Sequence, residues 1–247
     1  MPTPLASASA SCTGALALSP STSRPLSLNP LDTVRRLLKG AAPAAGSPLV
    51  SSALPDLDAL LGGGFPRGAL TEILSAAPGR GELQIILAPA AALGPTLWVL
   101  PSTDIFELSA PAMEAAGIDL SAQLFCVPRS PAEAFGTAVR AAAEHAVSAV
   151  AAWLPPLASL DDRRAMRKLA LAASSSGCTV FALRPAVMSC CASEAALRLQ
   201  ISPAPGASLR SLVRATHPQR LLHRSSEALV ALYPLRPAAR EAERQAA

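Results

Sequence analysis

Short apolar runs alternate along the chain with longer segments of helical character. The strand-like runs lie at residues 69–74, 96–100, 123–127, 148–154 and 178–183. Helix-like segments lie between them at 109–116, 130–145 and 161–176, and another apolar helix is expected to open after residue 81. This alternation predicts right-handed βαβ crossovers and a parallel sheet that is covered by helices on both faces.

Three further apolar runs follow one another without helices between them, at residues 196–201, 208–213 and 228–232. This change of pattern predicts that antiparallel strands extend the sheet. The predicted fold class is therefore α/β, with a mostly parallel sheet flanked by helices and antiparallel strands towards the C-terminus.

Polar residues mark the starts of two of these helices. Ser130-Pro131-Ala132-Glu133 has the pattern of a capping box with proline at the first helical position, and it predicts a helix that runs to about His145. Asp161 is the predicted N-cap of the next helix, which Gly177 ends.

The N-terminal part of the chain has a different composition. Residues 1–28 are rich in Ser, Pro, Ala and Thr, which predicts disorder, and residues 41–48 form a linker of similar composition. A short amphipathic helix is expected at 29–39 between them, and its apolar face carries Leu31, Val34, Leu37 and Leu38. That face is expected to dock either on the chain's own core or on a neighbour. The predicted domains are an N-terminal segment at 1–47, a core at 48–233 and an exposed tail at 234–247.

Composition favours a cytoplasmic protein without a membrane span. Of the 247 residues, 51% are hydrophobic and only 15% are charged, but the long uncharged apolar run 83–103 is interrupted by prolines and a glycine. No basic residue precedes Arg24, so the N-terminus lacks the pattern of a secretory signal. The five cysteines are expected to be reduced and mostly buried, and neither they nor the three scattered histidines have metal-ligand spacing.

The stretch from residue 54 to residue 88 has the layout of a phosphate-binding unit. Glycine-rich turns lead into the strand-like run 69–74, and the turn Pro78-Gly79-Arg80-Gly81 then opens a helix. In P-loop proteins, the backbone N–H groups of such a turn and the positive end of the helix dipole hold a phosphate. A working P-loop also needs a lysine and a hydroxyl.

Both of these side chains are missing. With Glu72 as the anchor of the comparison, the lysine position falls on or beside Gly81, and the hydroxyl position falls on Glu82, whose carboxylate would repel phosphate. Arg80 could supply some charge, but a structural strand-turn-helix without a ligand is favoured. No cofactor, metal ligand or catalytic residue is assigned to this degenerate P-loop, Gly79, Arg80 and Gly81.

Several fragments in this order resemble the RecA ATPase core and, more closely, the ImuA family of accessory proteins. The resemblance covers about residues 30–201 and is carried by LDALLGGGFPRGALTEI, WVLPSTD, AAGIDLSAQLFCV, VAAWLPP, RKLALAASSSGCTVFALRP and ASEAALRLQI. It implies a RecA-like core without ATPase activity. A RecA-type enzyme carries a glutamate after its second core strand, where Pro101 stands here, and an aspartate at the end of the Walker B strand, where Trp153 stands.

The resemblance also implies a role and partners. ImuA-type proteins support error-prone translesion synthesis in the SOS response to DNA damage. The implied partners are an ImuB-type protein related to Y-family polymerases, RecA and, through them, an error-prone C-family polymerase. Two alternatives are an inhibitor of cell division that resembles SulA and a residual RecA-type ATPase.

Basic residues mark candidate partner-binding surfaces. Arg163 and Arg167 lie one turn apart on the predicted helix at 161–176, where a solvated helix face is the simpler interpretation. The region from 210 to 224 contains no acidic residue and four arginines, Arg210, Arg214, Arg220 and Arg224. This cluster could bind DNA or an acidic partner. Because aromatic residues that would stack on bases are scarce, any contact with DNA is expected to be indirect.

Overall fold

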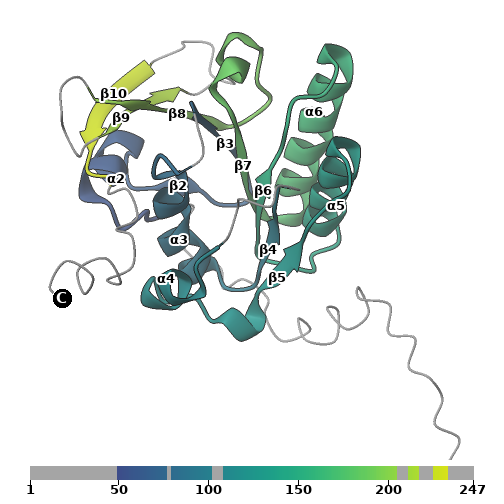
Figure 1. The fold of residues 1–247 in the computed structure, drawn as a ribbon, viewed down its shortest axis with the longest axis horizontal. Coiled ribbons are helices and arrows are strands. Elements are labelled where there is room, and N and C mark those ends of the chain that lie inside the picture. Colours follow the sequence, from purple (N-terminus) through teal and green to yellow (C-terminus); the bar gives the residue numbers. More distant parts are fainter. Residues whose placement is uncertain (1–48, 77–78, 102–107, 205–210, 217–224, 233–247) are drawn as a thin grey trace, which may run out of the picture.

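An eight-stranded sheet forms the centre of the molecule (Figure 1). The computed structural model describes residues 49–76, 79–101, 108–204, 211–216 and 225–232. The strands follow the order β10-β9-β8-β3-β7-β6-β4-β5 across the sheet. Their bounds are β3 (Leu70–Ser75), β4 (Thr96–Val99), β5 (Leu124–Cys126), β6 (Ala149–Trp153), β7 (Thr179–Pro185), β8 (Leu197–Pro203), β9 (Ser211–Thr216) and β10 (Ser225–Val230).

The pairing confirms the predicted fold class. All pairs from β5 to β8 are parallel, whereas β9 pairs antiparallel with both β8 and β10. A small antiparallel pair, β1 (Leu49–Val50) with β2 (Phe65–Pro66), precedes the main sheet. Strand β3 lies between β7 and β8, so the strand that leads into the degenerate P-loop is fully enclosed in the sheet.

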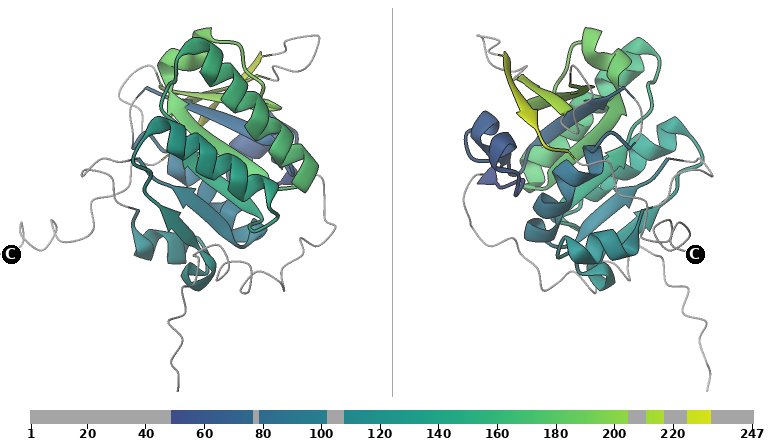
Figure 2. Two further views of the ribbon diagram at one scale, coloured as in Figure 1. Left: turned by 90° about the vertical axis from the view of Figure 1, so that its right-hand side faces the viewer. Right: turned by 60° about the vertical axis from the view of Figure 1, so that its left-hand side comes forward.

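Helices cover both faces of this sheet (Figure 2). The helices α5 (Pro131–Ala143) and α6 (Ser159–Ser176) pack on one face. The other face is covered by α2 (Pro55–Leu61), α3 (Glu82–Leu93) and α4 (Ala110–Ala115). Short 3-10 turns lie at Leu120–Ala122 and Ala186–Cys190.

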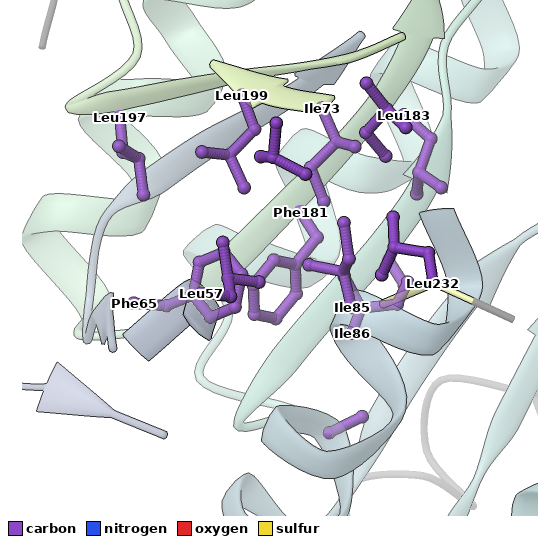
Figure 3. Close-up of a cluster of buried hydrophobic side chains, with 14 of the residues drawn as sticks. Leu57, Phe65, Ile73, Ile85, Ile86, Phe181, Leu183, Leu197, Leu199 and Leu232 are labelled. Atoms are coloured by element: carbon purple, nitrogen blue, oxygen red, sulfur yellow. The ribbon is translucent and has the colours of Figure 1, made fainter. Parts of the chain in front are cut away.

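Alternation along the strands supplies a separate apolar core to each face. On β7, Val180 belongs to the core beneath α5 and α6, and the next residue, Phe181, belongs to the core beneath α3. Figure 3 shows this second core, where Phe65 and Phe181 meet edge to face with ring centroids 5.3 Å apart. Period-two alternation is what a sheet covered on both faces requires.

One predicted helix start is confirmed and the other is wrong. The Ser130 hydroxyl accepts the N–H of Glu133 at 3.2 Å, although the Glu133 carboxylate accepts the N–H of Arg129 rather than that of Ser130. Asp161 is not the N-cap of α6. That helix starts two residues earlier, after Ala158, and it is Asp162 that accepts the N–H of Leu157, at 3.2 Å.

Several predictions lie outside the described residues. These are the disordered segment, the helix at 29–39 with Leu31, Val34, Leu37 and Leu38, and the tail at 234–247. Among the described helices, none is long and apolar enough to cross a membrane.

A buried network of charges links the central strands to α6. Glu72 on β3 accepts hydrogen bonds from Arg184 on β7 at 3.2 Å and from Arg198 on β8 at 2.7 Å. The second guanidinium nitrogen of Arg184 donates to Asp162, and the hydroxyl of Ser193 donates to Glu72 at 2.7 Å. Two carboxylates therefore face two guanidinium groups, so that the buried charges balance.

Glu72→Ala should destabilise the fold strongly, because it leaves two arginines without their shared carboxylate. Removal of one partner from a buried ion pair typically costs about 3–5 kcal/mol. Denaturant-induced unfolding should show this loss. The control is Asp161→Ala, which removes the partner of Arg164 from an exposed pair at 3.9 Å and should leave the unfolding midpoint nearly unchanged. Equal effects of the two variants would contradict this account of the network.

Candidate functional site

A cavity of about 410 Å³ opens where the parallel strands end. Its walls come from the carboxyl ends of β3, β4, β6 and β7, from the segment after β5, and from the first turns of α3 and α5. In open α/β sheets, this edge is the usual place for a ligand. The lining residues are Ile73, Ser75, Ala76, Glu82, Leu100, Pro101, Pro128, Ser130, Pro131, Ala134, Trp153, Leu154, Pro155, Leu183, Arg184 and Pro185.

The carboxylate of Glu82 binds the turn that precedes α3, in the place where a P-loop binds the phosphate of its ligand. One carboxylate oxygen of Glu82 accepts the N–H of Gly79 at 2.6 Å, and the other accepts the N–H of Arg80 at 2.8 Å. Glu82 is only 3% exposed. Successive backbone N–H groups at such a turn are the donors that hold phosphate in a P-loop. Here a side chain from the first helical position occupies them.

Gly81 cannot be replaced by the lysine of a working P-loop. Its φ is +95°, a left-handed conformation that glycine adopts without strain. A Cβ placed on it would lie 2.7 Å from the Cβ of Leu232, beyond the end of β10. The segment that follows β10 therefore packs directly against the turn, at the position where a P-loop would have its lysine.

The two tryptophans have different environments. Trp98 on β4 is buried, and its indole N–H donates to Gln123 at 3.0 Å. Trp153, which the resemblance to RecA-type enzymes aligns with the Walker B aspartate, is half-buried in the cavity wall. The last strand residue before the cavity is thus aromatic where a Mg²⁺-binding carboxylate would be needed.

Arg184 lines the cavity, but each of its three nitrogens already donates one hydrogen bond within the protein. One terminal nitrogen donates to Glu72, the other donates to Asp162, and Nε donates to the carbonyl of Leu154 at 3.4 Å. The guanidinium also lies over the ring of Phe135, 5.8 Å from its centroid. This cation is therefore a structural group rather than a ligand for phosphate.

The predicted basic residues that the structure describes lie in two separate parts of the molecule. Arg163 pairs with Glu194 at 3.2 Å, and Arg167 is exposed on the same helix. Arg214 lies on β9, near the edge of the sheet away from α6, and pairs with Glu227 on β10. Although no acidic residue lies between 210 and 224 in the sequence, a carboxylate on the neighbouring strand therefore pairs with Arg214. Arg210, Arg220 and Arg224 lie outside the described residues.

The described cysteines are free thiols in different environments. Cys178 is buried, and burial raises the pKa of its thiol to about 12. Cys126 is half-buried, but Cys190 and Cys191 are exposed, so the expectation of mostly buried thiols is wrong for this pair. Over the part of the chain that the structure describes, no three His, Cys, Asp or Glu residues form a group that could hold a metal ion.

Comparison with known proteins adds no assignment. Neither a scan against protein-family models nor a search of the curated proteins finds a match to this chain.

Glu82→Gln should destabilise the turn, because an amide has one acceptor oxygen for two backbone N–H donors. Gly79 and Arg80 are exposed, so water can replace part of the lost bond, and the net loss of one such hydrogen bond is typically about 0.5–1.5 kcal/mol. Thermal unfolding should show the loss as a lower midpoint. Glu114→Gln, an exposed change of the same kind on α4, is the control. Equal melting of the parent and Glu82→Gln would mean that the carboxylate does not hold the turn.

Proposed function

We propose that this chain is a non-catalytic, RecA-like accessory protein of the ImuA type, which supports error-prone translesion DNA synthesis in the SOS response through contacts with other proteins. Its proposed partners are an ImuB-type protein, RecA and, through them, an error-prone C-family polymerase. Any contact with DNA is indirect in this proposal.

One observation carries the non-catalytic part of the proposal. The two backbone N–H groups that would hold a phosphate are bound by the Glu82 carboxylate, which a phosphate would have to displace while overcoming its negative charge. Phosphoryl transfer depends on positioned charges around the phosphate. The lysine, hydroxyl, glutamate and aspartate that supply them in RecA-type enzymes are all replaced here.

The role in translesion synthesis rests on the sequence resemblance. Its fragments span β3, β4, β5, β6, β7 and β8, together with α6, and so lie across the parallel part of the sheet. A protein with this scaffold but without the catalytic groups can act through the surfaces by which it contacts other proteins. The proposed contact regions are residues 29–39, for which the sequence predicts a helix, the exposed residues of α6 and the C-terminal section.

Purified protein should not hydrolyse ATP, with or without single-stranded DNA. Release of inorganic phosphate in the presence of Mg²⁺ should equal that of the same preparation with the metal chelated. Glu82→Gln should also be inactive, because freeing the turn restores none of the missing catalytic groups. Metal-dependent turnover at about 1 s⁻¹, within the range of ordinary enzymes, would identify a residual ATPase instead.

The intact chain, used as bait in cells with damaged DNA, should recover the ImuB-type protein and RecA. A variant with Arg163→Glu and Arg167→Glu should recover less ImuB-type protein if α6 forms part of the contact. Arg129→Glu with Arg140→Glu is the control, since it changes the charge equally at two exposed arginines that do not belong to α6, one before α5 and one in its last turn. Recovery of the division tubulin in place of both partners would contradict the proposal and support a SulA-like inhibitor.

A further inference from the structure

Proline residues form much of the wall of the cavity at the carboxyl edge of the sheet. Five of its lining residues are prolines, which come from four separate segments of the chain: Pro101, Pro128, Pro131, Pro155 and Pro185. A proline ring fixes φ, so these wall segments have little freedom to collapse into the space. The cavity is therefore a formed part of the fold, and its volume of about 410 Å³ is within the range of small-molecule sites, about 300–1,000 Å³.

The charged groups in these walls are bound to the protein itself. Glu82 uses both carboxylate oxygens on the turn before α3, and Arg184 uses one N–H of each nitrogen on Glu72, Asp162 or a backbone carbonyl. The hydroxyl of Ser130 accepts the N–H of Glu133. A charged ligand would have to break these bonds, and an anion would also meet the negative charge of Glu82.

The remaining surface is suited to a flat apolar group. The indole of Trp153 and the side chains of Ile73, Leu100 and Leu183 line the same cavity as the prolines. Proline rings pack well on aromatic faces, which is how aromatic grooves recognise proline-rich peptides. Aromatic pairs add an edge-to-face or offset-stacked attraction of their own.

We propose that this cavity binds an uncharged aromatic group, held between Trp153 and the proline walls. The group is either a free aromatic molecule or an aromatic side chain of another protein, because both present the same ring. The inference does not depend on the proposed function, since it rests on the composition of the walls alone.

Fluorine NMR can test this directly, because the chain has two tryptophans and only Trp153 lines the cavity. Protein labelled with 5-fluorotryptophan should give two resonances, and Trp153→Phe assigns them. Titration with indole or p-cresol should shift the Trp153 resonance saturably and move the resonance of buried Trp98 much less. Benzoate, an aromatic anion, and ATP with Mg²⁺ should produce no saturable shift.

A matched pair of variants locates the site. Ala76 lies at the cavity and is exposed, so Ala76→Leu adds bulk to the rim without overpacking the core. It should weaken indole binding at least tenfold. Ala115→Leu makes the same change at an exposed position on α4 and should leave the affinity unchanged.

A free aromatic molecule and an aromatic side chain differ in that only the side chain is attached to a peptide, which can make further contacts around the cavity. Tighter binding of short peptides that contain tryptophan or phenylalanine than of the free rings would support a side chain as the occupant, and the reverse order would support a small molecule. The inference would be overturned if the Trp153 resonance did not respond to any neutral ring. It would also be overturned if Ala76→Leu bound indole as the parent does, or if ATP competed with indole.

Discussion

The buried charges around Glu72 are the constraint on which the central part of this fold depends. A carboxylate on an enclosed strand is costly unless opposite charges meet it, and here Arg184 from β7 and Arg198 from β8 do so. Arg184 extends the network to Asp162 in the first turn of α6. Strand order and helix placement are thus coupled, because β7, β8 and α6 must all be in position before the buried charges are compensated.

Pairing of charged groups within the protein also determines which ligands the carboxyl edge of the sheet can bind. Parallel α/β sheets commonly bind ligands there through free backbone N–H groups and cations. In this chain, Glu82 accepts hydrogen bonds from the N–H groups of Gly79 and Arg80. Arg184 is bound by the carboxylates of Glu72 and Asp162. What remains between the strand ends is an apolar cavity. A layout that resembles a phosphate site therefore has the opposite preference, for neutral groups over anions.

Local signals predicted much of the fold from the sequence, and contacts between distant segments account for the rest. The capping box at Ser130 depends on residues three positions apart and is confirmed, whereas Asp161 was misassigned because Asp162 turns towards Arg184, a partner 22 residues away. The last two strands lie about three residues from their predicted positions, because at an exposed sheet edge the cross-strand pair of Arg214 with Glu227 matters as much as an apolar run.

The candidate site shows most clearly that the sequence alone does not reveal contacts made by the folded chain. The sequence shows that the lysine and hydroxyl are missing, and it predicted that Glu82 would repel phosphate. It did not predict that the carboxylate of Glu82 binds the turn. Nor could local pattern reveal that Leu232 packs on Gly81, since about 150 residues separate them. Because a Cβ at position 81 has no space, a lysine there would require Leu232, in the segment after β10, to move. The features that oppose a phosphate at this turn therefore depend on the packing around it as well as on the identity of single residues.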